Sequence, residues 1–234
     1  MEEYSITRID RDVSSENFTE FRNTLRTAIE KTNGHVVLDF TSVNLVYSFG
    51  ISLMIKAMRM LNEKGRNLYV IINSPTLNDV FVVNNLNKLF HIFPDIEAFE
   101  FEFYRQHADG HSEAETELFE SISLTINVQP VSRTQLVLEL NGIMASERDY
   151  KLFRDTCDQN KDTYQKVLVD CKELSYVDSP GISALVDVNK LFRQAGGQLY
   201  LCSLSQFLLE ILETAHVNEF IPIFQNRVEA LNKW

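Results

Sequence analysis

The chain has 234 residues, 44% of them hydrophobic and 24% charged, which is the composition of a soluble globular protein. This length is enough for two domains of about 100–130 residues. The formal net charge of −11 argues against a nucleic-acid partner, because binding DNA or RNA needs a basic stripe, and no segment reaches the roughly 18 apolar residues of a membrane-spanning helix.

We therefore expect a cytoplasmic protein that binds neither nucleic acid nor membrane. The first residues, MEEYSITRIDRD, are charged throughout and do not have the pattern of a secretory signal. The three cysteines, Cys157, Cys171 and Cys202, are odd in number and lie in apolar patterns. They are predicted to be reduced core side chains and not part of a disulfide framework or a metal site.

Helices and strands are predicted to alternate along the first part of the chain. Ser15 is the expected cap of a helix. The apolar stripe of that helix comprises Phe18, Phe21, Leu25 and Ile29. The elements that follow are a strand Val36–Phe40, a helix Ile51–Lys64, a strand Leu68–Ile72 and a helix Thr76–Val83.

The segment Phe99–Tyr104 reads FEFEFY, and this strict alternation predicts a β-strand with Phe99, Phe101 and Phe103 buried on one face. Two interpretations are open: the strand completes the edge of the first sheet, or it forms a β-link between two domains. Residues 105–120 are acidic and polar, which is typical of a linker.

The second part of the chain begins with two strands, Ser121–Val128 and Gln135–Leu140, which can form a hairpin. Gly142 is expected at the turn that follows, and Ser146 at the cap of the next helix. The remaining elements are a strand Val167–Asp170, a helix that begins after Ser179 and ends at Gly196-Gly197, a strand Leu199–Leu204, a helix Gln206–Ala215, a strand Ile221–Phe224 and a last helix Val228–Trp234.

The two parts are copies of one another. A constant shift of 131 positions pairs Asp39 with Asp170 and Ser48 with Ser179 without a gap. A period this long indicates two copies of a whole domain and not a solenoid. We place these domains at residues 1–104 and 121–234. Because the shift sets Met1 opposite Ser132, the first copy is expected to lack the opening strand of the second.

Strands that alternate with helices of about a dozen residues imply right-handed crossovers and an α/β fold. We predict two tandem domains, each with a mixed, mostly parallel β-sheet packed with α-helices. In such sheets the functional loops lie beyond the carboxyl ends of the strands. Both copies carry their most similar residues, D-x8-S-x-G, in such a loop.

At this loop the sequence resembles the STAS domain, the fold of bacterial anti-sigma factor antagonists. The family motif is an apolar strand ending in Asp, then Asp-Ser-x-Gly opening a helix that ends in Gly-Gly. The second copy has it intact as Asp178-Ser179-Pro180-Gly181, and the first has Tyr47-Ser48-Phe49-Gly50. The resemblance implies that Ser179 is the residue phosphorylated by an anti-sigma kinase. Tyr47 in place of Asp makes Ser48 the less favoured position.

The residue types support a partner-binding site here. Pro180 suits the first helical position, so Ser179 is predicted to be the N-cap, where a phosphate would meet free backbone N–H groups. Gly181 leaves room for another backbone, so we expect Gly181→Val to harm partner binding more than stability. A simpler interpretation is that Ser179 and Ser48 are only helix caps.

In the first copy, Tyr47 and Phe49 flank Ser48 at a helix start. Two aromatic side chains at such a position suit a protein interface, and an inward-packed pair is an equally open interpretation. Asp39 and Asp170 follow apolar strands and are expected to accept hydrogen bonds from loop N–H groups rather than to act as catalytic carboxylates.

The resemblance implies a phosphorylation-controlled binding module. Its partners would be an anti-sigma factor or serine kinase-like protein and a PP2C-type phosphatase, and a homo-oligomer is also open. The alternatives are a STAS scaffold without phosphorylation and a sensor of nucleotides or small ligands. The chain has no Walker loop, dinucleotide-binding glycine pattern, Ser-His-Asp order or Cys-His cluster. We therefore expect no enzyme, no cofactor and no metal.

Overall fold

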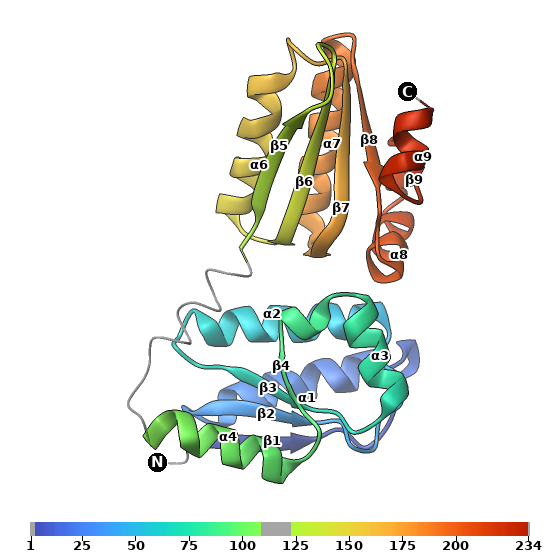
Figure 1. Ribbon diagram of the computed structural model, residues 1–234. Coiled ribbons are helices and arrows are strands. Elements are labelled where there is room, and N and C mark those ends of the chain that lie inside the picture. The colour runs from blue at the N-terminus through green and yellow to red at the C-terminus, as the bar shows by residue number, and fades with distance from the viewer. Residues whose placement is uncertain (1–2, 109–122, 234) are drawn as a thin grey trace. The chain divides into compact units, whose positions relative to one another are not determined.

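The computed structural model describes residues 3–108 and 123–233. The chain divides into two compact units, Met1–Phe119 and Glu120–Trp234. Each unit has one β-sheet with helices on both faces (Figure 1). The α/β class and the tandem arrangement of two mostly parallel sheets are thus as predicted. The described strands of the first sheet are all parallel, however, so only the second sheet is mixed.

The first unit has a sheet of four parallel strands in the order β1-β2-β3-β4. These strands are β1 Tyr4–Arg8, β2 His35–Asp39, β3 Leu68–Ile71 and β4 His91–Phe93. Tyr4 of β1 pairs with His35, as Gln135 pairs with Lys166 in the second unit. The described part of the first unit therefore begins at the equivalent of the second strand, as the sequence shift predicts.

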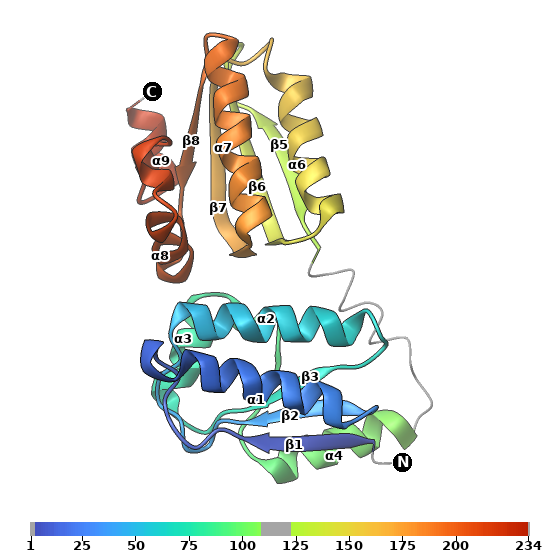
Figure 2. The ribbon, with the colours of Figure 1, turned by 180° about the vertical axis from the view of Figure 1, so that it is seen from behind.

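Helices cover both faces of this sheet. The helices α1 Phe18–Lys31 and α2 Ser48–Asn62 lie on one face, and α4 Ile96–Ala108 lies on the other (Figures 1 and 2). The helix α3 Pro75–Val83 follows β3. A short 3-10 turn, Ser15–Asn17, has Ser14 as its N-cap and leads into α1, whose own N-cap is Asn17, so the predicted cap at Ser15 is wrong.

The helix α4 corrects the predicted strand at Phe99–Tyr104. Phe99 and Phe103 are fully buried, whereas Phe101 is 72% exposed. The reason is local: Asp95 Oδ1 accepts the Ala98 N–H at 2.7 Å at the start of the helix. Phe99 and Phe103, four residues apart on one face of this helix, then pack together against Tyr69 of the sheet. Both strand interpretations are wrong, and so is the expected burial of Phe101.

The same helix bears on the predicted linker. Residues 105–108 belong to α4, so the predicted 105–120 segment begins inside a helix. Residues 109–120 lie outside the described part of the chain.

The second unit has a mixed sheet of five strands in the order β5-β6-β7-β8-β9. Only β5 is antiparallel to its neighbour, and the other pairs are parallel. The strands are β5 Thr125–Pro130, β6 Gln135–Met144, β7 Lys166–Val177, β8 Gln198–Cys202 and β9 Ile223–Phe224.

Two of these strands run further than the sequence predicts. Gly142, with φ of 95°, does not lie in a turn but inside β6, beside a register irregularity. The strand β7 continues through Asp170 to Val177. The irregularities lie in the pairing of β6 with β7, and a bulge lets a strand bend without ending. The residues after Asp170, which were expected to form a loop, therefore continue β7 almost to the start of α7.

The helices of the second unit are α6 Glu147–Asn160, α7 Ser179–Gln194, α8 Gln206–Thr214 and α9 Arg227–Asn232. The neighbours α6 and α7 cover one face of the sheet (Figure 2). The short α9 covers the other, through Ala230. The Ser146 side chain accepts the Asp149 N–H, which confirms it as the cap of α6.

The three cysteines are buried and free, as predicted. Burial raises the pKa of Cys202 to about 12 and raises the pKa of the Cys157 and Cys171 thiols as well. These thiols are therefore protonated at neutral pH. None of the helices in the described residues is both long and apolar enough to cross a bilayer.

Candidate functional site

The candidate site lies where β7 meets α7. Asp178 is the last residue before the helix and has an extended backbone, and its Oδ1 accepts the Gly181 N–H at 2.9 Å. Asp178 is therefore the N-cap, and the predicted cap at Ser179 is wrong. Ser179 and Pro180 are the first two residues of the helix. There the fixed φ of proline is favourable and its missing N–H costs nothing.

Exposure differs along this motif. Ser179 and Pro180 are exposed, Asp178 is half-buried and Gly181 is buried. Ser179 is thus an exposed residue at the positive end of a helix of 16 residues.

The Asp178 carboxylate is held at both oxygens. Its Oδ2 accepts the hydroxyl of Tyr150, a buried residue of α6, at 2.6 Å. Its own N–H donates to the Met144 carbonyl at 3.2 Å. Hydrogen bonds to an ionised acceptor are among the stronger ones in proteins, so the cap and the serine beside it have a defined geometry. The site residues predicted from the sequence did not include Tyr150.

The buried Gly181 is required by its own domain. A Cβ built on it would lie 2.7 Å from Val177 Cγ2 and 2.8 Å from the Met144 carbonyl oxygen. The backbone that comes close to this glycine is thus β6 of the same unit and not a partner. This corrects the expectation that Gly181→Val would harm partner binding more than stability.

The equivalent junction of the first unit is built from other groups. Tyr47 occupies the extended N-cap position of α2 and makes no side-chain cap hydrogen bond. Ser48, the first helical residue, is half-buried, and Gly50 is buried. A Cβ on Gly50 would lie within 2.9 Å of methyl groups of Val13 and Val46. The tight strand–helix contact is kept, but the carboxylate cap is not.

Aromatic side chains replace the carboxylate there. The ring of Phe49 lies 6.2 Å from the ring of Tyr47 in a stacked arrangement and 5.2 Å from Phe18 in an edge-to-face one. The Arg22 guanidinium lies 6.0 Å from the centre of the Phe18 ring. Phe49 is half-buried and Tyr47 is 49% exposed, so one ring packs inward and the other faces solvent.

A one-residue offset relates the first helices of the two units. Tyr150 and Phe153 of α6 match Phe18 and Phe21 of α1 when the shift is 132, and the matched pairs lie on the inward stripe of each helix. Phe18 thus takes the place of Tyr150. The hydroxyl that binds Asp178 is absent in the unit where Tyr47 replaces that carboxylate.

Asp39 accepts a hydrogen bond from a turn N–H, as expected, whereas the N–H that Asp170 accepts belongs to Lys172 inside β7 and not to a loop. Asp39 Oδ1 accepts the Thr41 N–H at 2.9 Å, and Asp170 Oδ1 accepts the Lys172 N–H at 3.2 Å. Asp39 Oδ2 also accepts Arg8 Nε at 3.1 Å. Burial opposes the charge of Asp39, but the hydrogen bonds from Thr41 and Arg8 outweigh it and lower its pKa.

Comparison with known proteins explains the shared architecture. The STAS domain family model matches residues 2–99 and again residues 124–230. The chain belongs to the STAS family. Its two STAS domains correspond to the two compact units, and Asp178-Ser179-Pro180-Gly181 and Tyr47-Ser48-Phe49-Gly50 are the equivalent junctions of the two domains.

Two curated relatives are similar to parts of the STAS protein. One is an anti-sigma F factor antagonist from Paenibacillus polymyxa, 26% identical over 69 residues, or 30% of this chain and 59% of that protein. The other, from Bordetella bronchiseptica, is a protein named BtrV that is classed with the anti-sigma factor antagonists. It is 27% identical over 95 residues, or 41% of this chain and 82% of that protein.

Two solved structures that match just under half of the chain are those of anti-sigma factor antagonist and STAS domain proteins. The anti-sigma factor antagonist SpoIIAA in its unphosphorylated form is 14% identical, with a TM-score of 0.42, and the match covers 47% of this chain and 95% of SpoIIAA. A STAS domain protein from Planctomyces limnophilus is 24% identical, with a TM-score of 0.39 and coverage of 46% and 95%.

Proposed function

We propose that this STAS protein is an anti-sigma factor antagonist-like binding protein that switches partners when Ser179 is phosphorylated. The observation that carries the proposal is the exposed Ser179 at the first position of α7, beside an Asp178 carboxylate fixed by Gly181 and Tyr150. Membership of the STAS family and the names of the two curated relatives support it.

The switch follows from the charge at this junction. A kinase would transfer a phosphoryl group from ATP to Ser179 Oγ, with ADP and a proton as the other products. The phosphate adds about −1.5 to −2 charges beside Asp178. The N-terminus of α7 stabilises that charge within the domain. A partner with an acidic surface at this junction would be repelled, and one with an apolar surface would have to desolvate the phosphate, so either would dissociate.

The partners follow from the family and not from the geometry. We propose that the unphosphorylated domain binds an anti-sigma factor or a serine kinase-like protein, and that a PP2C-type phosphatase restores this form. We place these events in the cytoplasm. In this proposal the protein acts by binding and carries out no catalysis of its own.

The first domain has a different part in this proposal. Ser48 is half-buried next to Tyr47, which supplies no carboxylate, so we assign Ser48 no phosphorylation. The exposed ring of Tyr47, supported by the half-buried Phe49, is instead proposed as a constant docking surface. Aromatic side chains of this kind are enriched at protein interfaces.

The deciding experiment is phosphorylation of the full chain by a cognate anti-sigma kinase, followed by mass spectrometry. Ser179→Ala should abolish incorporation of phosphate, while the matched variant Ser48→Ala should leave it unchanged. The unphosphorylated chain should retain the kinase in a pull-down, and Ser179→Asp should weaken that retention. Phosphate on Ser48 and none on Ser179 would reverse the roles of the two domains. Absence of phosphate from both serines would favour the scaffold alternative.

A further inference from the structure

The outer edge of β1 is the feature from which a further interaction can be inferred. In the second unit, β6 pairs with β5 on its outer side, but β1, the equivalent of β6, is the outermost strand that the structure describes in its sheet. An unpaired edge strand presents a row of N–H and C=O groups to which another strand can bind.

The hydrogen-bond pattern identifies the groups on this edge. His35 donates its N–H to the Glu3 carbonyl, and Ile9 donates its N–H to the Asp39 carbonyl, each at 2.9 Å. The odd-numbered residues of β1 therefore face β2. Since the backbone groups of a strand alternate in direction, the N–H and C=O groups of Tyr4, Ile6 and Arg8 point away from the sheet.

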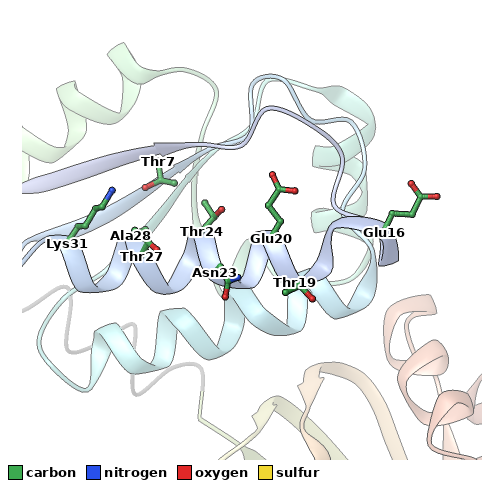
Figure 3. A pocket seen from close by; sticks show the side chains of 9 residues that line it. All are labelled: Thr7, Glu16, Thr19, Glu20, Asn23, Thr24, Thr27, Ala28 and Lys31. Carbon is green, nitrogen blue, oxygen red and sulfur yellow. The ribbon is translucent and has the colours of Figure 1, made fainter.

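There is open space beside this edge. A hollow of about 690 Å³ lies between β1 and α1. Figure 3 shows Thr7 on the strand side and a row of α1 residues on the other, among them Thr24 and Thr27. In the second unit, Leu124, just before β5, and Ile126, within it, pack into the core. The described residues of the first unit supply nothing equivalent.

Inward-facing residues of β1 are also unlike those of β6. The register places Ser5 and Thr7 where β6 has the fully buried Leu136 and Leu138. The Ser5 Oγ is buried and has no hydrogen-bond partner in the described part of the chain. An unsatisfied buried polar group costs about 1–3 kcal/mol. Rotation of the half-buried Ser5 side chain toward the open edge, where its hydroxyl would meet one supplied from outside, would relieve this cost.

We propose that β1 pairs antiparallel with β1 of a second copy of this chain, about a two-fold axis at Ile6. This register sets Ile6 opposite Ile6 of the second copy, in a pair that exchanges both backbone hydrogen bonds. Ser5 then lies opposite Thr7 of the second copy, in the closer kind of antiparallel pair. Ser–Thr hydroxyl bonds stabilise such pairs, and this one would satisfy the Ser5 Oγ.

The remaining pair of this register is complementary as well. It sets the Tyr4 ring opposite the exposed Arg8 guanidinium of the second copy, and aromatic rings attract such cations. A two-fold axis repeats every contact, as in most homodimers. The edge is thus complementary to itself, and this favours a second copy over an unrelated strand.

The test uses a cysteine at the proposed axis. The three native cysteines are buried, so Ile6→Cys adds an accessible thiol to the full chain. Directly opposite residues have Cα atoms about 5.5 Å apart, which is within the range of disulfides. Mild oxidation should give a disulfide-linked dimer that reductant reverses. In this register residue 8 lies opposite Tyr4 of the second copy and not opposite residue 8, so Arg8→Cys should cross-link severalfold less. Phe101→Cys, on the exposed face of α4, should also cross-link severalfold less.

A second pair of variants tests the backbone contact. Ile6→Pro removes an outward N–H and keeps the hydrogen bonds to β2, whereas Thr7→Pro removes one of those bonds. Light scattering of the wild type should show a monomer–dimer equilibrium. Ile6→Pro should shift it to monomer while the melting temperature falls less than in Thr7→Pro. A wild-type monomer at every concentration, or equal cross-linking at positions 6, 8 and 101, would overturn the proposal. So would an extended peptide that binds this edge of a chain that stays monomeric.

Discussion

A single carboxylate, that of Asp178, organises the start of α7. One oxygen caps the helix at Gly181 and the other accepts the Tyr150 hydroxyl. In the first domain Tyr47 and Phe18 stand at the two corresponding positions, so the carboxylate and its donor are replaced together. This paired change indicates that the Tyr150 hydroxyl is there to hold Asp178.

Removal of that hydroxyl gives the first prediction. Tyr150→Phe should lower the free energy of unfolding of the second domain by about 1.5–3 kcal/mol, because a hydrogen bond to a charged group is lost. Urea unfolding of the full chain measures this. The control is Tyr164→Phe, since the half-buried Tyr164 makes no hydroxyl hydrogen bond to the described residues. Equal effects of the two changes would mean that Tyr150 contributes only its ring.

Asp39 provides a prediction for pH. Its folded-state pKa is lowered from the ordinary value of 3.8, so its ionised form stabilises the first domain above that value. This contribution is lost as the pH falls through the lower, folded-state pKa. Asp39→Asn should therefore be less stable than the wild type by about 1–2 kcal/mol at neutral pH. The difference should shrink in urea titrations below the ordinary pKa, and a difference independent of pH would contradict the assignment.

The sequence predicts the position of the site but not its internal geometry. Asp178, Ser179 and Gly181 lie at the helix start, as the repeat indicates. The cap was assigned to the wrong residue because Asp and Ser are both strong N-caps and Pro180 is compatible with either choice. The Tyr150 contact was hidden by the one-residue offset between α1 and α6, which an ungapped shift cannot show.

Among the elements, α4 shows where sequence periodicity is ambiguous. Phe99 and Phe103 satisfy a strand alternation and also the four-residue spacing of a helix stripe. The repeat distinguishes the two possibilities, because the shift of 131 pairs Asp95 with Asn226 and Phe99 with Ala230, in the segment where a last helix was predicted. Both Asp95 and Asn226 accept a backbone N–H at a helix start, so α4 and α9 are equivalent helices.

The strand–helix junctions give a prediction that compares two glycines. Gly181→Ala should destabilise the second domain by about 1–3 kcal/mol, the usual cost of overpacking a core. Gly50→Ala should destabilise the first domain less. The new Cβ at Gly181 would meet the Met144 backbone oxygen, whereas at Gly50 it would meet only valine side chains, which can shift. Thermal melting of each variant measures the order of the two effects, and the reverse order would show that the Met144 carbonyl moves aside easily.

At the scale of the whole molecule, each domain has a core of its own. The main cluster of the second unit contains only residues between Leu124 and Ile221. The cluster beneath α4 in the first unit contains only residues up to Phe103. This is the organisation that a repeat of whole domains predicts. A domain with its own core can in principle fold alone.

The last prediction is that residues 120–234 form a folded, switchable domain without the first unit. This fragment should melt cooperatively, and Phe153→Ala, which removes a fully buried ring, should destabilise it by about 3–5 kcal/mol. With the cognate kinase it should incorporate phosphate at Ser179, as we propose for the full chain, because Asp178, Tyr150 and Gly181 all lie within it. Circular dichroism checks the folding and mass spectrometry the modification. A fragment that folds but resists the kinase would assign kinase docking to the first domain, where Tyr47 is exposed; an unfolded fragment would mean that the second core is not sufficient by itself.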